Sequence, residues 1–237
     1  MVFCAKAECE GAAEGGGRVT LSHHRIVFLG PPASGKGTAA MALSAALRVP
    51  HVSTGQMFRA AISKGGAVGG SAKQFIDKGQ LVPDEITMEV VRLWLDEHGR
   101  DGGFIFDGFP RTRAQAEAFD QVLRERGMPV TVAILLDASE ADILKRVLGR
   151  LSCETCGALY HNEFVPPRRP GTCDKCGGRL TQRADDTAET LRNRLEVYRR
   201  LTLDVARYYE QAGVLKRVDG GQPKDEVFAD IVGLLKS

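Results

Sequence analysis

Short apolar runs alternate with longer stretches in which apolar residues recur at helical intervals, from about residue 24 to the end of the chain. The apolar runs predict five strands, at 25–29, 50–53, 104–106, 130–136 and 214–218. The helical intervals predict helices at 35–47, 55–64, 68–78, 83–95, 112–126, 139–148, 187–211 and 224–235. Strands that alternate with helices favour an α/β fold, in which helices cover both faces of a parallel sheet.

The composition fits an ordinary globular protein, with 43% hydrophobic and 26% charged residues among 237 and a formal net charge of +2. So small a charge implies no general attraction to nucleic acid or membrane, and no apolar run approaches the length of a spanning helix. The start has no signal-peptide pattern, so we expect a cytoplasmic protein. Residues 1–23, rich in Gly, Ala and Glu, predict a disordered extension, either a natural tail or the product of an upstream translation start.

A phosphate-binding pattern follows the first predicted strand. Gly30-x-x-x-x-Gly35-Lys36 would let backbone N–H groups and the lysine charge converge on phosphate oxygens at a helix N-terminus. Gly37 stands where the usual pattern has a hydroxyl that ligates Mg²⁺, and the hydroxyl comes one residue later, at Thr38. We therefore expect a magnesium ion held mainly by waters and by a carboxylate elsewhere.

Four cysteines interrupt the strand–helix alternation and mark segment 151–182 as an inserted subdomain. The motifs Cys153-x-x-Cys156 and Cys173-x-x-Cys176 are separated by 16 residues, a spacing that suits tetrahedral zinc. Because all four ligands are sulfur, the site would be structural, and the metal would supply the folding energy of a segment too small for much core. Disulfides and an iron centre are the alternatives, and we expect the nearby His161 to be a surface residue and not a ligand.

Several motifs, in the same order as in one known family, give this chain a family resemblance. GPPASGKGT (30–38), HVSTGQMFR (51–59), GQLVPDE (79–85) and FDGFPRTRAQA (106–116) resemble segments of adenylate kinases. GRLSCETCGALYH, CDKCGGRL and QRADDTAETLRNRL resemble the lid of that family. The likeness runs from about Arg25 to the end of the chain, so chance agreement is a poor explanation.

The resemblance implies a P-loop NTPase-like fold, with a parallel five-stranded sheet and two insertions. They are an NMP-binding helical segment (53–82) and a zinc-ribbon lid segment (150–183), set in a core made of 24–52, 83–149 and 184–237. It also implies reversible Mg²⁺-dependent transfer, ATP + AMP ⇌ 2 ADP. For a single short chain with one active site, we expect a monomer. Two departures bear on this: Ala33, which fits only if its φ is negative, and Gln56, where aspartate is common.

The resemblance assigns roles residue by residue. It places the donor ATP at Gly30, Ala33, Ser34, Gly35, Lys36, Gly37, Thr38, Arg146, Arg150, Leu159, Tyr160 and Gln222. It places the acceptor AMP at Thr54, Gly55, Arg59, Gln80, Leu81, Val82, Gly108, Phe109, Pro110, Arg111, Gln115, Arg183 and Arg194. The residues implied in the transfer itself are Lys36, Asp107, Arg111, Arg150, Arg183 and Arg194.

Physical chemistry supports several of these roles. Arginine binds phosphate oxygens through a planar fork, and the amide of Gln115 can read an adenine edge because it both donates and accepts. Asp107 ends a predicted strand, where a carboxylate can hold magnesium through water, although it could instead cap the next helix. Tyr160 could instead belong to the lid core, and Asp185 and Asp186 would either hold lid arginines or cap the helix that follows.

Two other functions remain open at this stage. One is a kinase for another nucleoside monophosphate, or one that uses GTP as donor; Gln115 and the thiolate lid favour the adenylate form. The other is a zinc-ribbon adaptor without catalysis, bound to nucleic acid or protein. Against it, the basic residues lie in phosphate-site motifs, and only 6% of the chain is aromatic, which offers few stacking platforms.

Overall fold

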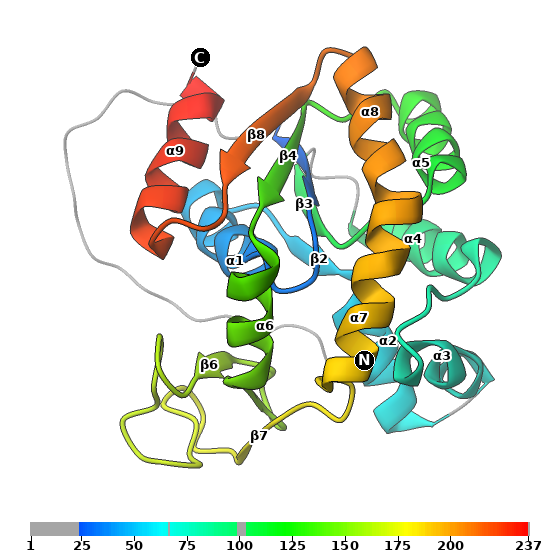
Figure 1. The fold of residues 1–237 in the computed structure, drawn as a ribbon. Helices are drawn as coiled ribbons and strands as arrows, with labels where there is room; N and C mark the ends of the chain where they lie inside the picture. The colour runs from blue at the N-terminus through cyan, green and yellow to red at the C-terminus, as the bar shows by residue number, and fades with distance from the viewer. Residues whose placement is uncertain (1–23, 66, 99–102, 237) are drawn as a thin grey trace.

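A five-stranded parallel sheet forms the centre of the molecule (Figure 1) in the computed structural model, which describes residues 24–65, 67–98 and 103–236. The extension expected at 1–23 lies outside the described residues. All five predicted strands are present and all pair in parallel, which confirms the predicted fold class. In spatial order they are β2 (His51–Ser53), β3 (Phe104–Asp107), β1 (Arg25–Leu29), β4 (Val132–Asp137) and β8 (Leu215–Asp219).

Helices cover both faces of the sheet, and their bounds lie within a few residues of those predicted. One face is covered by α1 (Lys36–Leu47) and α9 (Lys224–Lys236). The other is covered by α4 (Asp84–His98), α5 (Arg113–Glu125) and α8 (Leu203–Gln211). The remaining helices are α2 (Thr54–Lys64), α3 (Ala67–Asp77), α6 (Glu140–Leu148) and α7 (Ala188–Val197).

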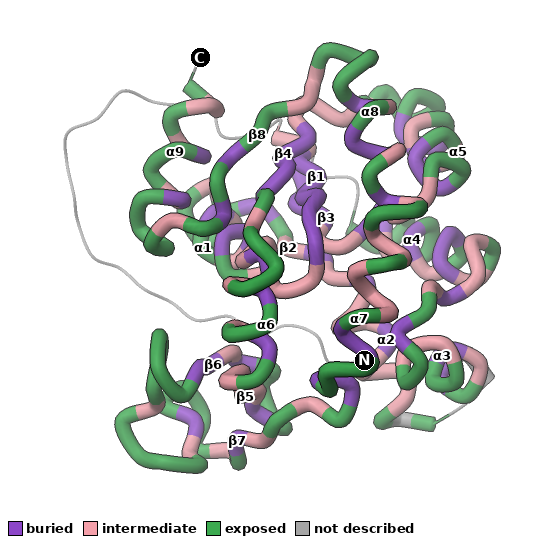
Figure 2. The backbone as a smooth tube through the Cα atoms, in the orientation of Figure 1, coloured by how far each residue is buried: buried purple, intermediate pink, exposed green. Residues whose placement is uncertain are grey.

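The two-residue period of the strands divides the core between these layers. Ile26 and Phe28 of β1 pack towards α1 and α9, while Val27 and Leu29 pack towards α4, α5 and α8. All four are at most 2% exposed, so the strand reads as an unbroken apolar run. Figure 2 shows the same pattern for the sheet as a whole: its central strands are buried, whereas the outer faces of the helices are exposed.

Hydroxyl side chains start three of the helices and explain their positions. Thr112 accepts a hydrogen bond from the N–H of Gln115 at the start of α5, and Ser139 accepts one from Asp142 at the start of α6. Thr187 does the same for α7 by accepting from Thr190. The cap of α7 is therefore Thr187, so capping by Asp185 or Asp186 is wrong.

The long helix predicted at 187–211 is interrupted. A π-helical turn, η2 (Tyr198–Thr202), joins α7 to α8. Within it, the hydroxyl of Thr202 donates to the carbonyl oxygen of Arg111 at 3.0 Å. A π-helical turn in a longer helix is frequent near functional sites, and here it contacts the chain beside a candidate phosphate ligand.

Two insertions have small apolar clusters of their own. In the lid segment, β5 (Arg150–Cys153), β6 (Leu159–His161) and β7 (Leu180–Thr181) form an antiparallel sheet in the order β6-β5-β7. Residues Cys153, Ala158, Tyr160, Cys173 and Leu180 form its buried cluster. In the NMP-binding segment, Phe58 and Ala72 pack with Val82. Among the described residues, no helix is long and apolar enough to cross a membrane.

Arg48, which ends α1, has a strained backbone, and relief of this strain should stabilise the protein. Arg48 is exposed and holds a left-handed backbone (φ 55°, ψ 37°) at the position where helices usually have glycine. Because a Cβ is costly there, we expect Arg48→Gly to raise the free energy of unfolding by about 1 kcal/mol. The melting temperature would rise by about 2–4 °C. Arg48→Ala, which keeps the Cβ, should give no comparable gain, and equal melting temperatures for the two variants would contradict the strain.

Candidate active site

A cavity of about 1150 Å³ opens where the parallel strands end, the place where open α/β sheets bind ligands. The residues after β1, β2, β3 and β8 line it, together with α6 and parts of both insertions. Every residue that the sequence analysis placed at the nucleotide sites or in the transfer lines this cavity except Phe109. The Phe109 ring is fully buried in the core, with its centroid 5.0 Å from that of Phe119, so its side chain does not face the cavity.

The loop between β1 and α1 brings the residues of the predicted phosphate loop to the cavity. Gly35 holds φ 100° directly before the first residue of the helix, so the helix N-terminus faces the cavity. The Nζ of Lys36 donates to the carbonyl oxygens of Gly30 (2.9 Å) and Pro31 (2.6 Å). These bonds hold the ammonium group inside the loop, where an incoming phosphate would meet it.

Ala33 contradicts one expectation for this loop. Its φ is 58°, in the left-handed region, whereas the sequence analysis required a negative value. The loop therefore carries an alanine in a conformation that suits glycine better. Ala33 is only partly buried and packs against the cluster of Ile143, Val147 and Leu191, so its methyl group gains contacts that a glycine would lack.

Gly37, the residue after Lys36, lies against the carboxylate of Asp107. A Cβ at Gly37 would lie 3.2 Å from Oδ2 of Asp107, so a larger side chain would crowd this oxygen.

Asp107 is the last residue of β3, and His51 of the neighbouring strand β2 lies beside it. The Nε2 of His51 is 3.7 Å from Oδ2 of Asp107, too far for a hydrogen bond. Burial alone would raise the pKa of Asp107, but His51 and the charge of Lys36 hold it below its usual value. Asp107 is thus a carboxylate aimed into the cavity, and not a helix cap.

The turn after β3 places Arg111 and Gln115 at the cavity. The Nε of Arg111 donates to the carbonyl oxygen of Gly108 at 2.6 Å, and the hydroxyl of Thr54 donates to the same oxygen at 3.1 Å. Gln115 is 2% exposed; its Oε1 accepts from the N–H of Arg111 (2.8 Å) and its Nε2 donates to Asp84 (2.6 Å). One N–H and one lone pair of this amide remain for a ligand.

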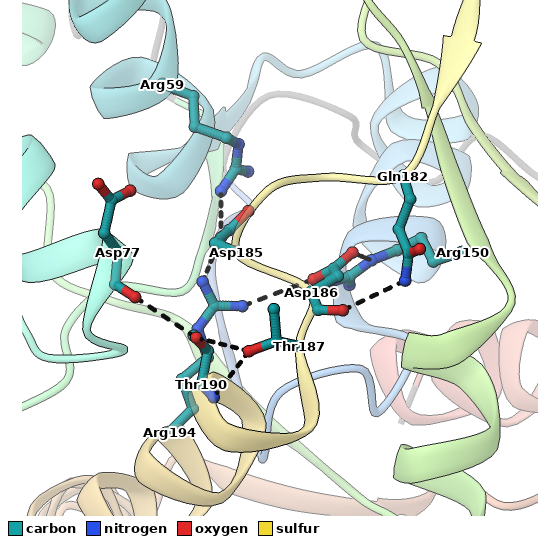
Figure 3. A network of polar contacts seen from close by, with 9 residues as sticks. All are labelled: Arg59, Asp77, Arg150, Gln182, Asp185, Asp186, Thr187, Thr190 and Arg194. Carbon is teal, nitrogen blue, oxygen red and sulfur yellow. Dashed lines mark hydrogen bonds and ion pairs between the residues drawn. The ribbon is translucent and has the colours of Figure 1, made fainter.

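Two adjacent aspartates gather arginines from three parts of the chain (Figure 3). Asp186 accepts from Nε of Arg150 at 2.7 Å and from its NH2, and Asp185 accepts from Arg194. Arg59 of α2 approaches Asp185 at 3.9 Å. Both aspartates are at most 6% exposed, so the arginine-holding role expected of them is the one that the geometry supports.

Positive charge dominates the cavity. Three acidic residues line it, Asp107, Asp142 and Asp225, against nine basic ones, Lys36, Arg59, Arg111, Lys145, Arg146, Arg150, Arg183, Arg194 and Lys224. Burial, with the repulsion of Arg111 and Arg150, lowers the pKa of Lys36 to about 8 despite the attraction of Asp107. Burial and neighbouring arginines also lower the pKa of Arg183 to about 9 and that of Arg111 to about 10. These groups stay charged at neutral pH but repel one another, which favours the binding of polyanions.

The four cysteines of the lid segment fit a tetrahedral metal. Their sulfur atoms all lie within 4.8 Å of one another, with Cys153 to Cys176 at 3.4 Å and Cys156 to Cys173 at 3.6 Å. A tetrahedral zinc with bonds of about 2.3 Å would separate its sulfurs by about 3.8 Å. A Cβ at Gly178 would come within 2.9 Å of the sulfur of Cys153, so only glycine leaves the cluster intact. All four thiols are free, which contradicts the disulfide alternative.

Tyr160 and His161 belong to the interior of the lid segment. The hydroxyl of Tyr160 accepts from the N–H of Asp174 at 2.8 Å and lies 3.6 Å from the sulfur of Cys173, as expected of lid core. His161 is 8% exposed, so its expected surface position is wrong, although it is no ligand of the cluster. No sequence pattern indicates this burial, because the hydrogen bonds of the His161 ring run to backbone groups.

Several residues that line the cavity were not predicted from the sequence, namely His51, Asp142, Lys145, Phe164 and Tyr198. His51 stands three residues before Thr54, so its place at the start of a recognised motif was the available signal. For Phe164 no pattern was available. Its ring is 51% exposed on the lid segment, with Nζ of Lys145 4.9 Å from its centroid.

Comparison with known proteins gives a consistent result. A family model described as adenylate kinase matches residues 28–214. The adenylate kinase of Clostridium tetani is 47% identical over 210 residues, covering 89% of this chain and 97% of its own. That of Syntrophomonas wolfei is 46% identical over 212 residues (90% and 99%), and that of Thermodesulfovibrio yellowstonii is 45% identical over 212 residues (90% and 99%).

The cysteine cluster generates a test of its own. Cys153→Ser removes one of four thiolates, so we expect loss of about one metal ion per chain and rapid proteolysis within 150–183. Metal content and limited proteolysis measure these effects. Ser152→Ala, on the same strand, is the matched control and should keep both metal and protease resistance. Full thermal stability and an intact lid segment in Cys153→Ser would contradict a structural metal.

Proposed function

The chain belongs to the adenylate kinase family, and we propose that it transfers a phosphoryl group reversibly from Mg²⁺-ATP to AMP to form two ADP. The observation that carries this proposal is that one cavity contains both a phosphate loop and a second group of arginines from other segments. Phosphoryl transfer between two nucleotides requires both anions to be held in line despite their repulsion. An arrangement of nine basic and three acidic lining residues suits that task.

The donor would bind along the loop after β1. Backbone N–H groups of Ser34 to Thr38 and the charge of Lys36 would hold its phosphates, as the α1 N-terminus favours anions. Arg146 donates to the carbonyl oxygen of Ser34 at 3.2 Å, which holds its guanidinium group beside the loop. Phe164 offers an exposed ring on the lid side of the same cavity, and stacking on such a ring suits a nucleotide base.

The acceptor would bind between the NMP-binding segment and the turn after β3. Arg59 and Arg111 would bind its phosphate, and the free N–H and lone pair of Gln115 would bind the adenine edge. The backbone at Gln80–Val82, which lines the same pocket, would complete the base site. The crowded guanidinium groups support this assignment, since a phosphate among them would relieve their repulsion.

Catalysis would rest on position and charge, because no step needs a covalent nucleophile. Lys36, Arg111, Arg150, Arg183 and Arg194 would surround the transferred group and stabilise the charge on its oxygens in the transition state. Asp107 would hold the magnesium ion through water, and the ion would supply charge that neutralises the donor phosphates. Arg150 and Arg194 would then exchange their aspartate partners for phosphate as the lid segment closes and excludes water.

The lid cluster would hold zinc in a structural role. Four thiolates close the coordination shell, which leaves no position for a substrate. The metal would instead stabilise a segment whose buried cluster contains only five residues. Iron could occupy such a site, and metal analysis of protein from its native cells distinguishes the two.

The proposed function is tested by initial rates with Mg²⁺-ATP and a panel of AMP, CMP, UMP and GMP. We expect fast ADP formation with AMP and little transfer to the others, because Gln115 presents both a donor and an acceptor to the base. Preference for another acceptor would be consistent with the proposed mechanism but would contradict AMP as the substrate. Absence of transfer to all four would contradict the proposed activity itself.

Arg111 provides a prediction on the acceptor side. Arg111→Ala should lower kcat/KM for AMP by about tenfold or more, since a charge-assisted hydrogen bond to phosphate is lost. The melting temperature should hardly change, because the cavity loses a charge repelled by its neighbours. Arg113→Ala is the matched control: Arg113 is exposed and pairs with Glu117 outside the cavity. A near-wild-type rate for Arg111→Ala would remove Arg111 from the site.

The lowered pKa of Lys36 predicts how donor binding depends on pH. Bound phosphate favours the protonated amine, whereas the free protein loses this proton around pH 8. ATP affinity should therefore be constant below about pH 7 and fall towards about tenfold per pH unit above pH 8. Calorimetry in two buffers of different ionisation enthalpy should detect proton uptake at pH 8.5. In Lys36→Arg the uptake at pH 8.5 should shrink to the smaller part that Arg183, with its pKa of about 9, contributes. Affinity independent of pH up to 9.5 in the wild type would contradict the lowered pKa of Lys36.

A further inference from the structure

We propose that His161 is a positioning residue for the donor site, whose neutral ring fixes the turn that presents Phe164 to the cavity. The proposal deepens the function proposed above and rests on it, because Phe164 is argued there to stack on the donor base. His161 itself lines the same cavity but is 8% exposed, and its polar atoms are engaged with the protein. It therefore acts through Phe164 and not on the nucleotide phosphates.

Both ring nitrogens of His161 have defined partners. Nδ1 accepts from the backbone N–H of Glu163 at 3.0 Å and from that of Phe164 at 3.1 Å. Nε2 lies 3.2 Å from the carbonyl oxygen of Lys145, which can only accept, so Nε2 must donate. These contacts define one state of the ring: neutral, with its proton on Nε2.

The contacts at Nδ1 fix the chain direction at Phe164. A side-chain acceptor here binds the backbone N–H groups two and three residues later. Asn and Asp side chains stabilise turns by the same arrangement. The turn is closed by the backbone bonds of His161 with Val165, at 3.0 and 3.3 Å. The rings of His161 and Phe164 also stack, with centroids 4.4 Å apart and planes 30° apart.

The contact at Nε2 ties this turn to helix α6. The carbonyl oxygen of Lys145 belongs to the last turn of α6, which also carries Arg146. Gly149, which ends that helix, lies so close that a Cβ there would be 2.4 Å from the imidazole ring. The N–H of Asn162 donates to the carbonyl oxygen of Gly149 at 2.9 Å, so ring and backbone hold the same junction. His161 thereby sets Phe164 relative to the helix that carries Arg146.

Two substitutions separate the Nδ1 bonds from general packing. His161→Asn places its carbonyl oxygen near the Nδ1 position and keeps the acceptor for the turn, whereas His161→Gln places its amide near the Nε2 position and removes it. We expect His161→Gln to raise the KM for ATP about tenfold, with the KM for AMP and kcat within about twofold. His161→Asn should stay within about threefold of the wild type in all three.

Phe164→Ala completes the experiment. It should raise the KM for ATP by about as much as His161→Gln, and the double variant should be no worse than Phe164→Ala alone. Additive effects, equal losses in the Asn and Gln variants, or an unchanged KM for ATP in His161→Gln would each overturn the proposal. If the wild type transferred no phosphate from ATP, the proposed function would fail before this comparison began.

The ring state provides a measurement that needs no activity. Two-bond ¹⁵N–¹H correlation spectra of histidine-labelled, metal-loaded protein at pH 7.5 should show His161 as the neutral Nε2–H form, identified by the loss of its signal in His161→Asn. Metal content of each variant shows whether the lid segment is still folded. A charged ring or a proton on Nδ1 would overturn the proposal, because neither leaves an acceptor for the turn.

Discussion

The structure depends on keeping a group of positive charges together around one partly buried cavity. Arginines and lysines from the core and from both insertions converge there, and their repulsion and burial lower the pKa of Lys36, Arg111 and Arg183. Asp185 and Asp186 hold several of these arginines in the described structure, and Asp107 faces Lys36. A polyanion satisfies the same charges more completely than three carboxylates can. The proposed function follows from this balance, because two bound nucleotides would bring their phosphates together at these charges.

The rest of the fold keeps these charges in place. Parallel strands end at a common edge, so the loops after β1, β2 and β3 reach one point although they are far apart in sequence. Glycine at position 37 lets α1 approach Asp107, and the turn at Gly108 holds Arg111. The two insertions contribute Arg59, Arg150 and Arg183 to the cavity, and each has a small apolar cluster apart from the two clusters that pack on the central sheet. The predicted phosphate loop is thus anchored on the main core, and the apolar clusters are separate where closure is proposed.

The sequence was informative where chemistry depends on spacing or period. Strand and helix positions followed from apolar periodicity, the phosphate loop from Gly30-x-x-x-x-Gly35-Lys36, and the sulfur cluster from its paired motifs. It failed where the outcome depends on tertiary contacts. The positive φ of Ala33, the burial of His161 and the inward ring of Phe109 are set by neighbours that no local pattern reveals. The π-helical turn at Tyr198–Thr202 was hidden for the same reason, since helix propensity does not distinguish it from a continuous α-helix.

The central claim is that one cavity holds two nucleotides in line, and a bisubstrate analogue tests it most directly. In such an analogue a chain of phosphates joins two adenosines, so it spans both sites only if they share a cavity at the correct separation. Titration calorimetry should show one analogue per chain, bound more tightly than either ATP or AMP alone. Neither ATP nor AMP should bind once the analogue is bound. Two analogues per chain, or an affinity no better than that of ATP, would contradict the account because the two phosphate sites would then be independent.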